Sequence, residues 1–210
     1  MELYRDPEIR IECLPLGGHE SNCYLLFCLR TREVVIIDAP DEGEKIAEGV
    51  RGAAVRALVI THSHGDHVGA VEELRSRLKM PVVAHIKEAE DVPSGVDFAL
   101  VGGETIRCGQ LTLEVMATPG HTPGSISLRL GRHLFGGDTL FPNGPGYTRT
   151  PASFRRLIAT LRRRIFTLPD DTIVYPGHGA TTTLGQERKL FNRFLSRPLD
   201  ANICGDVLWM

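Results

Sequence analysis

The 210-residue sequence lacks any long apolar run, and its charges are close to balance, with a formal net charge of −2. No apolar stretch approaches the ~20 residues of a membrane-spanning helix, and residues 1–8 are charged, without the apolar segment of a signal peptide. The small negative charge gives no support for a surface that binds nucleic-acid phosphates. These absences predict a cytoplasmic protein that binds neither membrane nor nucleic acid.

Cysteine is sparse and irregularly spaced. The five cysteines are odd in number and show no Cys-x-x-Cys spacing, which is typical of reduced structural thiols and not of a disulfide framework. The chain also lacks a Gly/Ser/Pro-rich linker. With 42% hydrophobic residues it therefore predicts a single domain, residues 1–210, that has a full core.

What the sequence does contain is a cluster of potential metal ligands within residues 62–67, His-Ser-His-Gly-Asp-His. Four of these six side chains can bind a metal, and core packing does not require such a spacing. An apolar, β-branched run at 57–61 precedes the cluster, and apolar residues at helical spacing follow it over 69–79. The cluster is therefore predicted to be a loop between a strand and a helix.

The spacing within the cluster suits two metal ions. In an extended segment His62 and His64 point the same way. Gly65 permits a sharp turn that can send Asp66 and His67 toward a second position. One loop could thus supply two ligands to each of two metals.

Four further candidates each follow a predicted strand and adjoin Gly or Pro. A lone histidine is more often a hydrogen-bonded core residue, and a lone aspartate is often a turn former or an N-cap. The cluster and these four residues nevertheless all lie at strand ends, which indicates that they belong to one metal centre. The four are Asp38 after 34–37, His121 after 111–115, Asp138 after 134–137 and His178 after 172–174.

In this set and order the chain resembles the metallo-β-lactamase-fold hydrolases, and more closely their small glyoxalase II-like (hydroxyacylglutathione hydrolase-like) members. The resemblance extends from Asp38 to residues 176–179. It implies a four-layer αββα sandwich with the metal site at one edge, whereas the strand and helix pattern by itself predicts only a mixed α/β domain.

The resemblance also implies how the ligands divide. In the resemblance, Asp38 is an acid that does not bind metal itself but holds the histidine loop in position. The resemblance assigns the bridging position between both metals to Asp138. The first metal's ligands would be His62, His64 and His121, and the second's Asp66, His67 and His178.

A ligand set of histidine nitrogens and carboxylate oxygens suits two divalent ions, zinc in the first place, with iron or manganese as alternatives. A water held between two such ions would have its pKa lowered toward about 7, which makes hydroxide available at neutral pH. Asp66 is also a catalytic candidate, because it could orient this water or accept its proton. The resemblance implies a small-molecule thioester substrate, with S-lactoylglutathione as the reference.

Two features bear on substrate binding. Relatives often carry Gly-Cys-Gly-Lys or Gly-Cys-Gly-Arg after the bridging aspartate, whereas residues 144–147 here are Gly-Pro-Gly-Tyr. Tyr147 could hydrogen-bond a substrate, and Arg149 could supply the cation instead. Only residues 179–210 follow His178, too few for the C-terminal helical domain that helps larger relatives hold glutathione.

Several alternatives remain open. A lactonase would use much the same metal ligands, and a mononuclear iron persulfide dioxygenase also resembles the chain but would consume oxygen. A β-lactamase would be expected to carry an export signal, nuclease relatives carry long insertions, and a non-catalytic metal-binding protein would have no reason to keep both ligand sets. The oligomeric state is open.

Features outside the predicted centre have simpler interpretations. Residues 154–165 predict a helix with a cationic, solvated outer face. His19 is predicted in a loop, His85 at a strand end and His133 in a hairpin turn, while Trp209 could dock onto the domain or a partner subunit.

Overall fold

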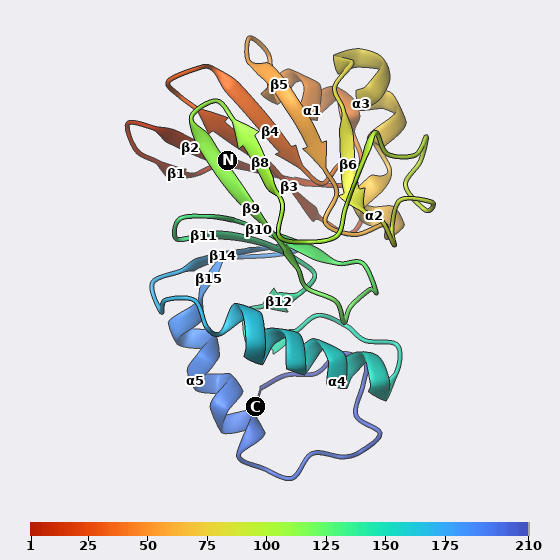
Figure 1. Ribbon diagram of the computed structural model, residues 1–210, viewed down its shortest axis with the longest axis vertical. Helices are drawn as coiled ribbons and strands as arrows, with labels where there is room; N and C mark the ends of the chain where they lie inside the picture. Colours follow the sequence, from red (N-terminus) through yellow and green to blue (C-terminus); the bar gives the residue numbers. More distant parts are fainter. Residues whose placement is uncertain (210) are drawn as a thin grey trace.

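Two β-sheets lie face to face between two layers of helices in the computed structural model, which describes residues 1–209 (Figure 1). The first sheet is antiparallel from β1 to β4 and parallel from β4 to β7. Its strands lie in sequence order: β1 (Glu2–Arg5), β2 (Ile9–Leu16), β3 (Ser21–Cys28), β4 (Glu33–Ile37), β5 (Ala54–Val59), β6 (Val82–His85) and β7 (Phe98–Leu100).

The second sheet is antiparallel except where β11 and β14 pair in parallel. A two-stranded hairpin, β12 (Leu140–Phe141) with β13 (Gly144–Pro145), follows β11. The order of the second sheet is β15 (Thr182–Thr183), β14 (Ile173–Pro176), β11 (His133–Gly137), β10 (Ile126–Leu130), β9 (Leu111–Ala117) and β8 (Thr105–Cys108).

The main core fills the space between the sheets because strand side chains alternate between faces. In β9, Leu111, Leu113 and Val115 are buried while Thr112 and Glu114 are exposed. Strand β3 is buried along its whole length, because sheet neighbours cover its edges and other layers cover both of its faces. These packed strands form the rigid base for the loops at their ends.

Helices cover the outer face of each sheet (Figure 1). Against the first sheet lie α1 (Gly43–Gly49), α2 (Gly65–Val68) and α3 (Val71–Leu78), and against the second α4 (Pro151–Thr160), the π-helical turn η1 (Leu161–Ile165) and α5 (Leu184–Leu195). Within residues 1–209, no helix combines the length and apolar character needed to cross a bilayer.

The four-layer αββα sandwich that the resemblance implies is confirmed. The loop after β5 does lead into helix: α3 lies within the predicted range 69–79, and the short α2 precedes it, beginning inside the histidine cluster. His133 contradicts its prediction: it is the first residue of β11, is 4% exposed and hydrogen-bonds the Tyr175 hydroxyl at 2.9 Å. Trp209 packs on Phe191 and Phe194 of α5 and is 1% exposed.

The loops after β4, β5, β9, β11 and β14 meet at one edge of the sandwich, where backbone hydrogen bonds join the two sheets. The Ile126 amide donates to the Thr61 carbonyl at 2.9 Å. The Asn22 amide of the first sheet donates to the Gly177 carbonyl at 2.7 Å, and within the second sheet the Gly177 amide donates to the Gly137 carbonyl at 2.9 Å. This edge is therefore held together by the main chain on both sides of the predicted histidine cluster.

Candidate metal centre

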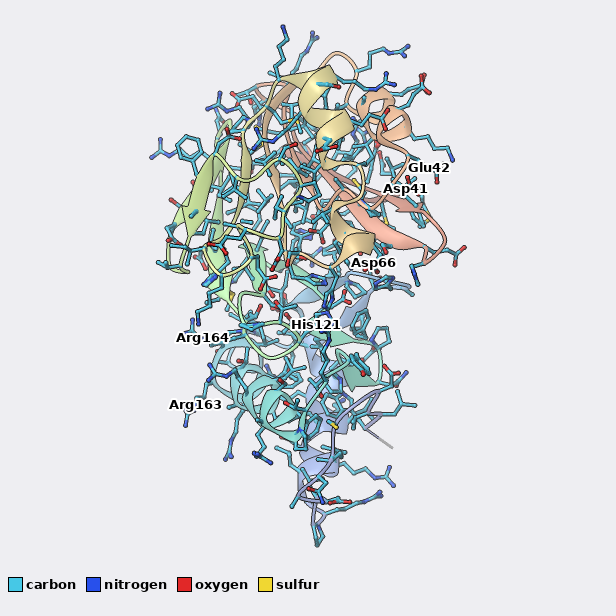
Figure 2. The ribbon with its side chains drawn as sticks, turned by 90° about the vertical axis from the view of Figure 1, so that its right-hand side faces the viewer. Asp41, Glu42, Asp66, His121, Arg163 and Arg164 are labelled. Carbon is cyan, nitrogen blue, oxygen red and sulfur yellow. The ribbon has the colours of Figure 1, made fainter. Side chains whose placement is uncertain are left out.

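All seven predicted metal ligands converge at this edge. Figure 2 labels Asp66 and His121 near one another at the middle of the molecule. Three overlapping groups of their side chains have ligand atoms within 4.8 Å of one another: His62 with His64 and His121, His62 with His67 and Asp138, and Asp66 with His67 and His178. The structure thus brings together residues separated by more than one hundred positions in the sequence.

The first ligand set consists of His62, His64 and His121. The Nε2 atom of His121 lies 2.8 Å from Nδ1 of His64 and 3.2 Å from Nε2 of His62. His62 is fully buried, and the side chain of His121 is 5% exposed. Three ring nitrogens therefore face one small volume that is closed to solvent on the His62 side.

The second ligand set consists of Asp66, His67 and His178. The Nε2 atom of His178 lies 3.3 Å from Nε2 of His67 and 3.2 Å from Oδ2 of Asp66. His67 is fully buried, whereas the side chains of His178 and Asp66 are 28% and 29% exposed. The second set is thus the more open of the two.

Asp138 lies between the sets and reaches both. Its Oδ2 is 3.6 Å from Nε2 of both His121 and His178, and its Oδ1 is 3.4 Å from Nε2 of His67. Oδ1 is buried and has no hydrogen-bond donor among the described residues. A buried carboxylate oxygen without a donor is costly unless a cation binds it.

The second ring nitrogens of two buried histidines are held by Asp38 and Thr61. His67 donates from Nδ1 to Oδ2 of Asp38 at 2.9 Å. The Thr61 hydroxyl gives its one proton to the same carboxylate at 2.8 Å, so it must accept from Nδ1 of His62 at 3.1 Å. In the neutral form of each ring the lone pair is therefore on Nε2, the atom that faces the centre.

Backbone carbonyl groups orient two further histidines. His121 donates from Nδ1 to the Tyr147 carbonyl at 2.8 Å, and His178 donates from Nδ1 to the His19 carbonyl at 3.1 Å. Four histidines thus turn their Nε2 lone pairs toward one another and toward two carboxylates. An assembly of acceptors at such distances requires cations, so the residues fit divalent metal ions with nitrogen and oxygen ligands.

Asp38 adopts a left-handed backbone conformation, with φ of 61°, which is uncommon for a residue other than glycine. Its Oδ1 accepts from the Thr61 amide at 2.7 Å, and its own amide donates to the Val59 carbonyl at 2.9 Å. These bonds fix the carboxylate under the histidine loop. Its position matches the role that the resemblance implies.

The electrostatics of the buried groups also favour a cation. Burial, with His67 and His121 nearby, lowers the pKa of His62 well below its usual value, so its ring stays neutral. Burial also opposes charge on His67, but Asp38 and the other carboxylates outweigh it and raise the pKa to about 9. Burial of Asp66 is likewise outweighed, mainly by His67, and its pKa is lowered. In the metal-free protein His67 therefore holds a second ring proton, which a metal would have to displace in order to bind there.

Tyr147 and Arg149, the predicted substrate contacts, lie in the loop that follows β13. The Tyr147 side chain is 46% exposed, and its backbone carbonyl is the group that reaches the centre. Arg149 is exposed and lines a cavity of about 620 Å³ together with His64 and His121. Lys87 lines the same cavity, so two cations border the space beside the first ligand set.

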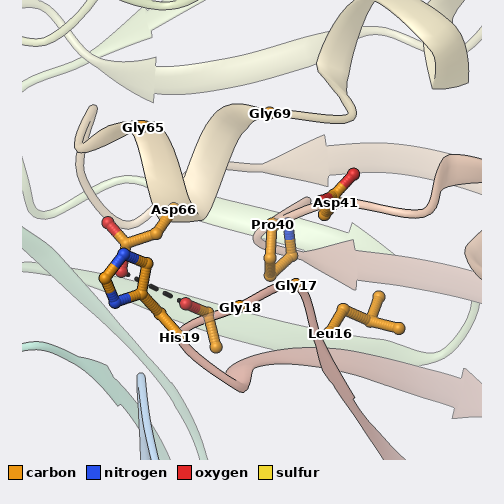
Figure 3. A pocket seen from close by; sticks show the side chains of 10 residues that line it. Leu16, Gly17, Gly18, His19, Pro40, Asp41, Gly65, Asp66 and Gly69 are labelled. Carbon is orange, nitrogen blue, oxygen red and sulfur yellow. Dashed lines mark hydrogen bonds between the residues drawn. The ribbon is translucent and has the colours of Figure 1, made fainter.

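A second cavity, of about 520 Å³, opens beside the second ligand set (Figure 3). Ser21 donates its hydroxyl proton to Oδ2 of Asp66 at 3.2 Å, the dashed line in Figure 3. Four glycines, His19, Asp41 and Asp66 are among the residues that line it. His19 is in a loop as predicted, but it borders the site and orients His178 through its carbonyl.

Sequence reasoning missed the residues that support the ligand loops. The buried Asn22 side chain donates to the carbonyls of Pro176 and Gly179, each at 3.0 Å, and so holds the loop that carries His178. Glu88 receives hydrogen bonds from two other ligand loops. Neither residue adjoins a ligand in sequence, and the backbone carbonyls of residues 19 and 147 leave no signature in the side-chain pattern.

The family follows from this fold and site together with a direct comparison. The family model of the metallo-beta-lactamase superfamily matches residues 16–178, more than half of the chain. The chain belongs to the metallo-beta-lactamase superfamily.

Three curated relatives refine the comparison. The hydroxyacylglutathione hydrolase of Polaromonas sp. is 36% identical over 160 residues, which are 74% of this chain but only 60% of that protein. Hydroxyacylglutathione hydrolase GloC of Haemophilus influenzae is 29% identical over 211 residues, covering 90% of this chain and 99% of that protein. The human persulfide dioxygenase ETHE1 is 34% identical over 182 residues, covering 80% of this chain and 69% of that protein.

Proposed function

We propose that the protein is a metal-dependent hydrolase of small thioesters, with S-lactoylglutathione as the reference substrate. The observation that carries this proposal is the set of Nε2 lone pairs facing two carboxylates, which suits two divalent ions with Asp138 between them. When bound, such ions would lower the pKa of a water and polarise the substrate carbonyl. Neither a serine nor a cysteine nucleophile is then needed.

The chain's own residues would supply the remaining functions. Asp66 is partly exposed and holds its Oδ2 toward the open side of the second set, where it could orient a water or accept a proton. Arg149 and Lys87 border the cavity beside His64 and suit an anionic substrate such as a carboxylate-bearing thioester. The similarity to a hydroxyacylglutathione hydrolase, GloC, over 99% of that protein's length supports this function.

A persulfide dioxygenase with one iron is the second candidate, because a human enzyme of that name is 34% identical to the chain. The first ligand set and its surroundings would suit one iron as well as zinc. The two candidates differ in metal number and in oxygen consumption. A lactonase would share the dinuclear site and differ in substrate.

The test is elemental analysis of protein purified without added metal, combined with assays on a thioester, a lactone, a β-lactam and a glutathione persulfide. About two metals per chain and thioester turnover would support the hydrolase, and removal of metal by a chelator should abolish that turnover. One iron per chain with oxygen consumption on the persulfide would overturn it in favour of the dioxygenase. Lactone turnover without thioester turnover would establish the lactonase instead.

A further inference from the structure

Glu88 is a buried carboxylate that lies just after β6 and receives four hydrogen bonds. Its Oε2 accepts from the amide of Ser63 at 3.0 Å and from the Ser63 hydroxyl at 2.5 Å. Its Oε1 accepts from the Thr122 hydroxyl at 2.8 Å and from the Gly124 amide at 2.7 Å. Glu88 is 3% exposed, and no described cation pairs with it in a salt bridge. Four hydrogen-bond donors therefore satisfy both of its carboxylate oxygens.

These four donors come from two loops that both carry ligands of the first set. Ser63 lies between His62 and His64, and Thr122 directly follows His121. One oxygen of Glu88 therefore holds the loop after β5, and the other holds the loop after β9. The carboxylate thereby fixes the distance between ligands that come from different sheets.

The packing around Glu88 leaves little room for a change in this arrangement. A Cβ atom on Gly124 would lie 2.6 Å from Oε1 of Glu88, closer than such atoms approach in practice. The Thr122 hydroxyl is also 2.7 Å from the Ser125 hydroxyl, which accepts from the Thr122 amide at 3.1 Å. The loop after β9 is therefore built around the carboxylate.

We propose that Glu88 is the positioning residue of the first ligand set, setting the spacing of His62, His64 and His121 through Ser63 and Thr122. It touches no ligand atom and acts only through the two loops. Asp38 has the corresponding place beneath the second set, where it bonds directly to His67. The inference rests on the metal centre of the proposed function and is independent of the substrate.

The first test is Glu88→Gln, measured by titrating the metal-free protein with cobalt(II) and following its visible absorption. The glutamine amide has to face two donors, so one loop loses its partners. We expect one of the two binding steps to weaken by about 10- to 100-fold and the other to stay within about twofold, because groups that orient ligands contribute on this scale. Thermal unfolding in excess chelator reports separately on the stability of the fold.

Two ligand variants identify which step has weakened. His64→Ala removes a ligand of the first set, and His178→Ala removes one of the second set. Each cobalt-binding step has its own absorption spectrum. The spectrum of the first-set step should be missing from His64→Ala and present in His178→Ala. The step that Glu88→Gln weakens should show this first-set spectrum. Equal weakening of both steps, or weakening of the step missing from His178→Ala, would overturn the proposal, as would unchanged affinity with reduced stability.

Ser63→Ala provides a milder variant in case Glu88→Gln does not fold. It removes one donor, keeps the amide bond to Glu88 and should weaken the same step by a smaller factor of about 3 to 10, the scale of one hydrogen bond to a charged group. Glu33→Gln is the matched control. Glu33 also joins two segments, accepting from the Gly109 amide at 2.9 Å and pairing with Arg56 at 3.0 Å, but it lies at the end of β4 opposite to Asp38. Its substitution should leave both metal steps unchanged.

These measurements separate the inference from the proposed function. If the protein binds two metals but lacks thioesterase activity, the expected effect of Glu88→Gln is unchanged. If Glu88→Gln leaves both metal affinities intact while the wild-type protein hydrolyses thioesters, the positioning role fails and the proposed function stands.

Discussion

The two halves of the metal centre are built from similar side chains but differ in exposure and in support. In the first set His62 is buried, and the buried Glu88 hydrogen-bonds both of the loops that carry its ligands. The second set contains the partly exposed Asp66 and His178, and Asp38 bonds one of its ligands directly. The difference indicates that the first half is held by a buried carboxylate shared between its loops, while two ligands of the second half are accessible to solvent.

The support of the second half also comes from further apart in the chain. His178 is held by the carbonyl of His19, in the turn between β2 and β3, and its loop is held by Asn22 in β3. His67 is held by Asp38 at the end of β4. The second half thus depends on contacts among more segments, whereas in the first half one side chain, Glu88, joins the two ligand loops. Substitutions can test this comparison.

The largest effect is expected from Asp138→Ala, which removes the side chain that both halves share. We expect the metal content to fall from about two per chain to below one, and hydrolysis to fall by about 1000-fold or more, because loss of metal-ion stabilisation costs several kcal/mol in the transition state. Elemental analysis and steady-state kinetics provide the measurements. Asp171→Ala, at an exposed position, is the control. If the Asp138→Ala protein keeps full metal content and activity, Asp138 does not bridge the two halves.

Asp38→Asn should weaken the second half more than the first, in contrast to Glu88→Gln, because Asp38 bonds His67 directly and reaches His62 only through Thr61. Asparagine tolerates the left-handed backbone at this position but cannot accept from both His67 and Thr61. We expect the metal step that is missing from His178→Ala to weaken by about 10- to 100-fold, measured by the cobalt titration. Equal or greater weakening of the step that is missing from His64→Ala would show that Asp38 does not act mainly on the second half.

Gly177→Ala probes the contact between the sheets next to His178. A Cβ atom there would lie 2.0 Å from Oδ1 of Asp138 and 2.8 Å from Cε1 of His67. Overpacking of this kind costs about 1–3 kcal/mol of unfolding free energy, and here it should also reduce binding at the second half. Chemical denaturation and metal titration would measure both. Gly18→Ala, where no atom lies within 4 Å of the added Cβ, should change neither.

The smallest effect is expected from Arg149→Ala on the open side of the first half. An exposed guanidinium that pairs with a substrate carboxylate contributes about 0.5–1 kcal/mol, so KM for an anionic thioester should rise by about two- to fivefold with kcat unchanged. Steady-state kinetics at low and high salt would show a smaller difference at high salt. Arg107→Ala, exposed in β8, serves as the control. An unchanged KM would exclude Arg149 as a substrate contact.

Much of the fold and of the candidate centre could be predicted because ligands in one loop are constrained by local geometry. Residues 62–67 combine extended backbone with a following helical turn, so their side chains divide between two positions. Asp138, His121 and His178 were recognisable by their places after predicted strands. The sequence also predicted a hairpin turn at His133, where packing against Tyr175 instead extends the strand.

The supporting groups could not be predicted in the same way. Glu88 lies among charged residues at 87–91, where a solvated surface would be expected from composition. Tyr147 and His19 orient His121 and His178 through their backbone carbonyls, a group that every residue has. Their importance depends on which loops pack beside each other.

The sequence by itself therefore determined the candidate metal-ligating residues, the strand ends that carry them and the family to which the chain belongs, because these depend on residue identity and local periodicity. Only the tertiary structure decided which nitrogen of each histidine faces the centre, how exposed each half is and which buried carboxylate supports it. Those properties depend on hydrogen bonds between segments that are distant in the chain. Such bonds form only once the two sheets pack together and exclude water from the groups between them.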